Sequence, residues 1–184
     1  MACCNSNLSE TELLQSLLDQ ERASFDRLQQ VIQAISSGTG DCSCGFAYFF
    51  NKEVSDTVAI AAPFPFDSDG LFSPAVFAHT ASPVVATSAP ITILQAGTYR
   101  VEYSVTVAEA RQIALYINGA VVSNTIYGAA TGTVVTTAFA IITAAANDVL
   151  TLRNHLSAAA LTLVTPSGGT AENVTNSILI EKLA

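Results

Sequence analysis

The cysteines are the residues best placed to do chemistry in this chain. They occur as two close pairs, Cys3 with Cys4 and Cys42 with Cys44. Neighbouring cysteines rarely bridge each other, so each pair is better placed to form a disulfide with another segment or another chain. A zinc site would need a two-residue spacing or nearby histidines, and unpaired thiols are a further alternative. We therefore take all four cysteines as candidates for inter-chain disulfides.

The other polar candidates lack the neighbours that catalysis or metal binding needs. His79 and His155 are the only histidines, and no motif links either of them to a nucleophile. Residues 67–70 (DSDG) are similar to the start of a calcium loop, but Ala78 stands where a bidentate glutamate should be, so we expect a plain turn. Asn173 begins a glycosylation sequon, which has meaning only on a secretory route. The sequence predicts no catalytic site, no metal and no cofactor.

The composition excludes several classes of protein. The 184 residues are 50% hydrophobic and only 12% charged, which is unlike a disordered chain. A net charge of −8 offers no positive surface to nucleic acid or to anionic lipid. The most apolar stretch, residues 137–146, is too short to span a bilayer. The first residues lack the basic and apolar regions of a signal peptide, which argues against classical secretion. We expect neither nucleic acid nor membrane as a partner.

An amphipathic helix is predicted before residue 38. Ser9 and Glu12 have the spacing of a capping box, which marks a helix start. The apolar side chains recur every three or four residues, as in a coiled coil, and only Glu21 interrupts the pattern. This association seam consists of Leu14, Leu18, Phe25, Leu28, Ile32 and Ile35.

Two interpretations of this helix remain open. It could lie along its own domain, or it could associate with copies of itself or with a partner protein. Leu13 and Leu17 widen the apolar face, which favours three or more helices or a partner groove. A seam this short is not stable by itself, so association needs the neighbouring domain to bring chains together.

The residues after about 45 predict an all-β sandwich. Apolar and polar side chains alternate most clearly at residues 99–107, and Asn118 with Gly119 fits the tight turn of a hairpin. Roughly eight to ten short strands follow one another, separated by Pro, Gly, Asn and Asp. The aromatic run at residues 46–50 has two interpretations, a strand of this sandwich or an inserted connector.

A series of segments gives the β portion its resemblance to a known family. They are YFFN at 48–51, AGTYRVEY at 96–103, ALYINGA at 114–120, DVLTLRN at 148–154 and SILIEKLA at 177–184. Over residues 46–184 the chain resembles the C-terminal domain of the collagen-like glycoproteins of Bacillus-type exosporium. The resemblance implies a jelly roll of the C1q/TNF type that assembles as a homotrimer on the spore surface.

The chain departs from that family in front of the β domain. Family members carry a long Gly-X-Y collagen stalk there, whereas this chain has only 10 glycines and no such repeat. We expect residues 1–45 to serve anchoring or assembly and residues 46–184 to be the trimerisation domain. The predicted function is that of a structural, non-enzymatic spore-surface protein, which links trimers into an appendage or fibre or anchors them to the outer layer. Its expected partner is itself, with another spore-coat or exosporium protein as a further candidate.

A ligand-binding or glycan-binding tip is the alternative function. The loops at residues 123–133 and 165–176 are rich in Ser, Thr, Asn and Gly, which suits the binding of sugars or receptors. Tyr127 is the only evident aromatic platform for a sugar in these loops.

Overall fold

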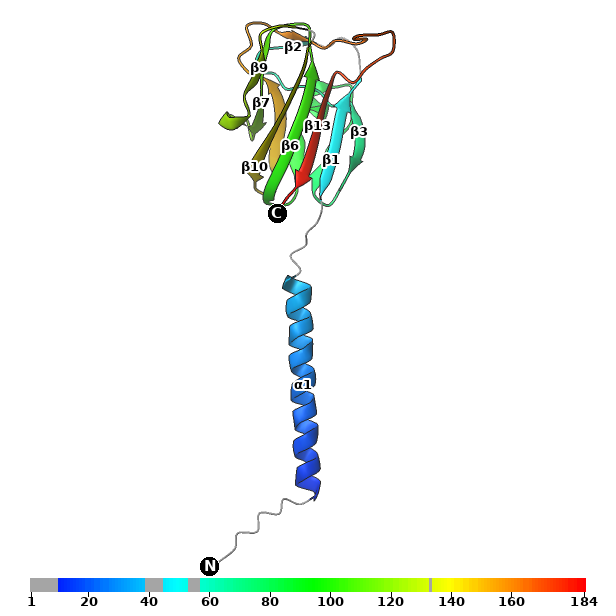
Figure 1. Ribbon diagram of the computed structural model, residues 1–184, viewed down its shortest axis with the longest axis vertical. Helices are drawn as coiled ribbons and strands as arrows, with labels where there is room; N and C mark the ends of the chain where they lie inside the picture. The colour runs from blue at the N-terminus through cyan, green and yellow to red at the C-terminus, as the bar shows by residue number, and fades with distance from the viewer. Residues whose placement is uncertain (1–9, 39–44, 53–56, 133) are drawn as a thin grey trace, which may run out of the picture. The chain divides into compact units, whose positions relative to one another are not determined.

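Two compact units make up the chain, Met1–Cys42 and Ser43–Ala184. The computed structural model describes residues 10–38, 45–52, 57–132 and 134–184. The first unit contains the helix α1 (Glu10–Gly38), and the second contains the strands (Figure 1). Among the described residues, no helix is long and apolar enough to cross a membrane.

Helix α1 is continuous over 29 residues. Its sequence is rich in Leu, Gln, Glu and Arg, which are good helix formers, and it contains no glycine before Gly38 and no proline. Gln15 Nε2 donates a hydrogen bond to Asp19 Oδ1 one turn further on, at 3.2 Å. The predicted helix is confirmed, while Ser9 of the expected capping box lies outside the described residues.

The second unit contains two main antiparallel sheets. The first sheet has the order β10 (Val135–Ala144), β6 (Gly97–Thr106), β13 (Asn176–Lys182), β1 (Phe46–Asn51), β3 (Ser68–Phe72). The second has the order β4 (Phe77–Ala78), β5 (Ile91–Ile93), β11 (Asp148–Asn154), β7 (Arg111–Ile117), β8 (Ala120–Val121), with β9 (Tyr127–Ala129) also paired to β7. The remaining elements are the pair β2 (Thr57–Val58) and β12 (Leu161–Thr162) and two short helical turns, α2 (Val85–Ser88) and η1 (Ser123–Thr125).

The chain passes repeatedly from one sheet to the other. It goes from β5 to β6 to β7, and later from β10 to β11, changing sheet at each step. Paired strands in both sheets run antiparallel, and Figure 1 shows the first sheet with β6 and β13 at its centre. These crossings between two packed antiparallel sheets define a jelly roll. The predicted all-β jelly-roll sandwich, preceded by an amphipathic helix, is confirmed.

The hydrophobic core lies between the two sheets. On β6 the side chains of Tyr99, Val101, Tyr103 and Val105 are at most 2% exposed, as the alternation of this strand predicted. Neighbouring strands of both sheets, together with the segment between β2 and β3, contribute further side chains of the same kind. Fully buried examples are Phe49, Phe64, Phe66, Ile91, Ile113, Leu115, Leu150, Leu152, Ile178 and Ile180.

The predicted hairpin between β7 and β8 is confirmed. Asn118 and Gly119 have φ angles of 50° and 80°, the left-handed region that a type I′ turn requires. The side chain of Asn118 also ties this turn to β11. Its Oδ1 accepts a hydrogen bond from the N–H of Val149 at 2.9 Å, and its Nδ2 donates one to Asp148 Oδ1 at 2.7 Å.

At the start of the β domain, one sequence-based expectation is wrong and an open alternative is settled. The plain turn expected at residues 67–70 is wrong, because Ser68–Phe72 forms β3, paired antiparallel with β1. Gly70 allows this close pairing, since a Cβ atom there would lie 2.6 Å from Tyr48 Cδ1. The aromatic run at 46–50 belongs to β1, between β13 and β3, so it is a strand of the sandwich and not a connector.

Candidate self-association surface

Exposed apolar side chains gather on one face of the first sheet. This outer face consists of alternate residues from four neighbouring strands: Val135, Thr137, Phe139 and Ile141 of β10, Arg100, Glu102 and Ser104 of β6, Ser177, Leu179 and Glu181 of β13, and Phe46, Tyr48 and Phe50 of β1. Phe139 and Ile141 are 65% and 60% exposed, although both are large and apolar. Clustered side chains of this kind are typical of a surface that another protein covers.

The strand register arranges the outer face in rows. One row contains Phe139, Glu102, Leu179 and Tyr48, and the next contains Ile141, Arg100, Glu181 and Phe46. Each row therefore begins and ends with an apolar side chain. The charged side chains lie between them, on the two central strands.

The polar centre of the outer face is an ion-paired cluster. Arg100 donates from Nη1 to Glu181 Oε2 at 3.1 Å and from Nη2 to Glu102 Oε2 at 3.0 Å. The three side chains are 46%, 41% and 38% exposed in that order, so water screens the pairs and they stabilise the single chain little. Because Arg100 is shared by two carboxylates, the cluster has a net charge of −1, so a partner that covers this centre must compensate for one negative charge.

The β1 side of the outer face is aromatic. The rings of Tyr48 and Phe50 stack with their centroids 5.4 Å apart, and the ammonium of Lys52 lies 5.7 Å from the centre of the Phe50 ring. Rigid rings of this kind present a large contact area with little loss of side-chain entropy on binding.

The corresponding face of the second sheet is already covered by the chain itself. Ala114 and Thr151, which alternate with core residues on β7 and β11, are 0% and 6% exposed. The guanidinium of Arg153 lies 4.9 Å from the centre of the Tyr116 ring on this face. This face therefore offers much less apolar surface to a partner than the outer face does.

The predicted association seam is only partly described. Leu14, Leu18, Phe25 and Leu28 are 56%, 50%, 60% and 56% exposed on α1. The side chains of Ile32 and Ile35 lie outside the described residues, as do Cys3, Cys4, Cys42 and Cys44. The predicted disulfides therefore stay predictions.

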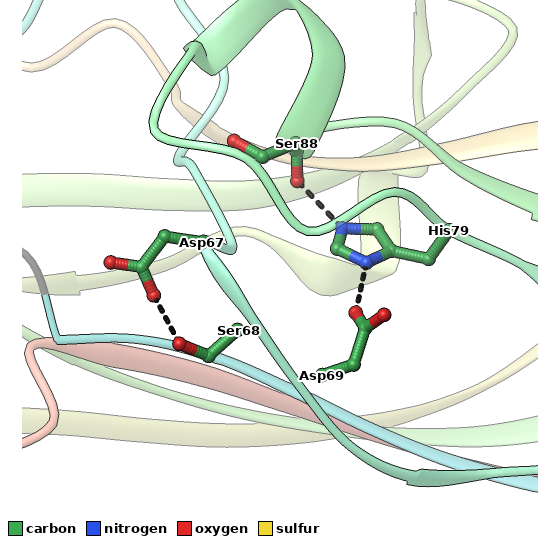
Figure 2. A network of polar contacts seen from close by, with 5 residues as sticks. All are labelled: Asp67, Ser68, Asp69, His79 and Ser88. Carbon is green, nitrogen blue, oxygen red and sulfur yellow. Dashed lines mark hydrogen bonds and ion pairs between the residues drawn. The ribbon is translucent and has the colours of Figure 1, made fainter.

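His79 has a structural environment (Figure 2). Its side chain is fully buried, its Nδ1 lies 2.6 Å from Asp69 Oδ1, and its Nε2 lies 2.8 Å from the carbonyl oxygen of Ser88. Its ring also stacks on Phe49, with centroids 4.2 Å apart. With both ring nitrogens bonded inside the domain, His79 ties β3 to the end of α2 and has no nitrogen left for a substrate.

The acidic residues beside His79 do not form a calcium loop. Asp67 accepts hydrogen bonds from the hydroxyl of Ser68 at 2.8 Å and from the N–H of Lys52 at 3.2 Å, whereas Asp69 pairs with His79. The described residues contain no group of three or more His, Cys, Asp or Glu side chains that could hold a metal ion.

The second histidine and the sequon also have structural contacts. His155 Nδ1 lies 2.7 Å from the hydroxyl of Tyr116. Asn173 Oδ1 accepts a hydrogen bond from the N–H of Ser167 at 2.7 Å, and its Nδ2 donates to the carbonyl of Val164 at 3.2 Å. These hydrogen bonds hold the Asn173 side chain within its loop.

Arg111 is a buried residue whose burial and hydrogen bonds no sequence pattern indicated. It is 3% exposed and donates from Nε to Thr136 Oγ1 at 2.7 Å. Its Nη1 donates to the carbonyls of Glu109 at 3.2 Å and Thr131 at 3.1 Å, and its Nη2 donates to that of Val134. Burial lowers the pKa of the Arg111 guanidinium. The side chain connects β7 with the start of β10 in the facing sheet.

Tyr127, the predicted sugar platform, is 37% exposed. Its hydroxyl donates to the carbonyl of Phe139 at 3.1 Å, and its ring packs edge-on against Tyr103. Burial, with a contribution from nearby Tyr127, raises the pKa of Tyr103 above its ordinary value of 10.0. Tyr127 thus has a packing role, and the glycan-binding alternative stays a prediction.

Comparison with known proteins concerns the fold. No protein-family model and no curated protein sequence matches the chain. Among solved structures, GITRL from pika is 15% identical with a TM-score of 0.44, over 77% of this chain and 96% of that chain. Eiger TNF from S. frugiperda is 16% identical with a TM-score of 0.48, over 77% and 94%. The globular domain of zebrafish complement 1qA is 10% identical with a TM-score of 0.49, over 75% and 94%. The strand order described above defines the β domain as a jelly roll.

Proposed function

We propose that this chain is a structural protein of the spore surface. In this proposal a homotrimeric jelly roll forms the body, and the N-terminal region links trimers into an appendage or anchors them to the spore outer layer. The observation that carries the proposal is the outer face of the first sheet, where Phe139 and Ile141 are more than half exposed. C1q/TNF-like domains often form trimers, which fits such a face. The resemblance to exosporium glycoproteins supports the spore surface as its location.

Association through the outer face has a clear physical basis. Covering a side chain such as Phe139 or Ile141 stabilises a complex by about 1–2 kcal/mol, because each is already more than a third buried in the single chain. Three copies contribute this gain three times, against the loss of translational and rotational freedom on association. A rotationally symmetric trimer closes on itself, so the same patch does not continue into an uncontrolled fibre.

The N-terminal region supplies features suited to attachment. Four seam side chains of α1 are at least half exposed, and two cysteine pairs flank the helix in the sequence. Thiols on either side of the helix in the sequence can join copies covalently, or join this protein to another spore-coat or exosporium protein. In the described part of the chain both histidines have structural partners, which favours a structural function over an enzymatic one.

Sedimentation velocity of the full-length protein tests the trimer. At micromolar concentration we expect a trimer for the wild type and a much smaller species for Phe139→Glu, because the new carboxylate would be buried against a neighbour. Leu156→Glu is the matched control, since Leu156 is 71% exposed but lies outside the outer face. A monomeric wild type, or equal loss of trimer in the control, would contradict the proposal.

Immunogold labelling of intact spores of the source organism tests the location. We expect label on the outer layer or on appendages, and electron microscopy of the purified protein then separates the two roles of the N-terminal region. Filaments that shorten in reductant indicate a linking role, and discrete trimers indicate an anchor. An absence of label from the spore surface would overturn the proposed location. Discrete trimers that also bind a glycan array would favour the alternative, a glycan-binding tip.

A further inference from the structure

Helix α1 has two hollows on the side of its apolar seam. The first is lined by Leu17, Gln20, Glu21, Ser24, Phe25 and Leu28. The second is lined by Glu21, Arg22, Phe25 and Asp26. Both hollows therefore include Glu21, the residue that interrupts the seam, and both lie in the middle of the helix.

The composition of the hollows matches the holes of a parallel coiled coil. In such a coil each seam side chain enters a hole made by four residues of the facing helix. For helices that are parallel and in register, the heptad spacing gives Phe25 a hole made of Glu21, Ser24, Phe25 and Leu28 of the neighbouring copy. The first hollow contains all of these residues.

The second hollow matches the hole for Glu21. The same spacing gives that side chain a hole made of Leu18, Glu21, Arg22 and Phe25 of the neighbouring copy. The second hollow contains the last three, with Asp26 beside them. A Glu21 carboxylate that entered this hole would lie next to the Arg22 guanidinium of another chain.

We infer that Glu21 and Arg22 pair between copies of this chain and hold three α1 helices parallel and in register. This inference rests on the proposed homotrimer, because rotational symmetry makes the three helices parallel and places equivalent residues at the same height. Arg22 then lies between two carboxylates, Glu21 of one copy and Asp26 of its own, and balances the repulsion between them. The occupant of the exposed seam is a second and a third copy of the same helix.

A charged pair within an apolar seam specifies geometry more than it adds stability. A leucine at position 21 would bury more apolar surface, whereas Glu21 is best accommodated where a neighbouring Arg22 is present. Copies that shift along one another, or that reverse direction, separate the pair. Glu21 is therefore a specificity-determining residue of the helix association.

Disulfide trapping in the full-length chain tests this arrangement. Cys3, Cys4, Cys42 and Cys44 are replaced by Ser, and Leu28→Cys is introduced as the reporter. Parallel, in-register helices bring the three thiols introduced at position 28 together, so mild oxidation should join chains. In a mixture of separately tagged Leu14→Cys and Leu28→Cys proteins, bonds between the two kinds of chain should be rare, because those positions meet only when the helices are antiparallel or shifted along one another.

Charge exchange tests the pair itself. Glu21→Arg or Arg22→Glu, each added to the Leu28→Cys protein, should slow the joining of chains about tenfold, as the loss of three weak ion pairs predicts. The double exchange should restore the rate. Arg27→Glu makes the same change of charge away from the seam and should leave the rate within about twofold.

The outcomes separate this inference from the proposed function. Abundant bonds between Leu14→Cys and Leu28→Cys chains, or a double exchange that fails to restore the rate, would overturn the inference. Sedimentation velocity of the same samples then shows whether they are trimers or monomers. A trimer whose Leu28→Cys chains do not join contradicts only the helix pairing, whereas a monomer contradicts the proposed homotrimer as well.

Discussion

The β domain and helix α1 differ in the exposure of their phenylalanine side chains. Phe49 on β1 is fully buried between β-domain side chains, whereas Phe25 on α1 is 60% exposed. The β domain completes its own hydrophobic core within one chain, while the described seam of α1 remains uncovered. The difference teaches that the β domain can be stable without α1, so substitutions in the core of the β domain and on the seam of α1 should affect different measurements.

The largest expected effect is on the core. Phe49→Ala removes a ring that contacts His79 and Phe72 and should lower the free energy of unfolding by about 3–5 kcal/mol. Phe25→Ala should leave the unfolding of the β domain within about 0.5 kcal/mol of the wild type. Urea denaturation followed by circular dichroism measures both. If Phe25→Ala destabilised the β domain as strongly, the two regions would not be independent in stability.

The comparison of the two regions extends to a polar residue type, with Arg111 buried in the β domain and Arg27 exposed on α1. Arg111→Met keeps the apolar stem but leaves the carbonyls of Thr131 and Val134 without this donor, so we expect a loss of about 1–3 kcal/mol. Arg27→Met on the exposed α1 surface should change the free energy of unfolding by less than about 0.5 kcal/mol. The same denaturation experiment compares them, and equal effects would contradict a special role for the buried guanidinium.

A smaller effect should appear only at alkaline pH. Burial raises the pKa of Tyr103 above 10.0, so the folded domain keeps this proton after the unfolded chain has released it. The stability that Tyr103 contributes is therefore present below about pH 10 and is lost as the pH rises further. We expect Tyr103→Phe to flatten the fall in thermal stability above pH 10. Tyr99, whose pKa burial also raises, should account for part of the remaining fall. An unchanged pH profile would argue against this assignment.

The smallest effect on the β domain is expected from the cysteines. Replacing Cys3, Cys4, Cys42 and Cys44 by Ser should leave its unfolding curve unchanged, because all four precede β1 in the sequence. The same substitutions should lower the resistance of the assembled protein to heat and detergent under oxidising conditions. Gel electrophoresis after heating, with and without reductant, measures this resistance. Equal resistance of wild type and variant without reductant would argue against cross-linking.

The regular parts of the fold could be predicted because local patterns reflect them directly. The alternation around Tyr99–Val107 predicted a strand with one buried face, and Asn118 with Gly119 predicted a hairpin. The three-four spacing of leucines predicted α1. In each case the side-chain period follows from the geometry of a single element, and no knowledge of neighbouring elements is needed.

The missed features depend on partners that are distant in the sequence. Asp67, Ser68, Asp69 and Gly70 look like a turn, yet pairing with β1 makes most of this segment a strand. Arg111 gave no signal, since its partners lie more than 20 residues away or are backbone carbonyls. The outer face likewise emerged only from the register of four strands, which places Phe139 and Tyr48 in one row.

The hairpin at Asn118 has a consequence for how the molecule ages. Asparagine followed by glycine is prone to spontaneous deamidation, because the glycine nitrogen can attack the side-chain amide carbon and expel ammonia. In the folded domain the Asn118 amide is engaged at both ends, by the N–H of Val149 and the carboxylate of Asp148. Deamidation of Asn118 therefore requires the turn to open first. The two hydrogen bonds of the Asn118 side chain thus link the chemical lifetime of this residue to the stability of the fold around it.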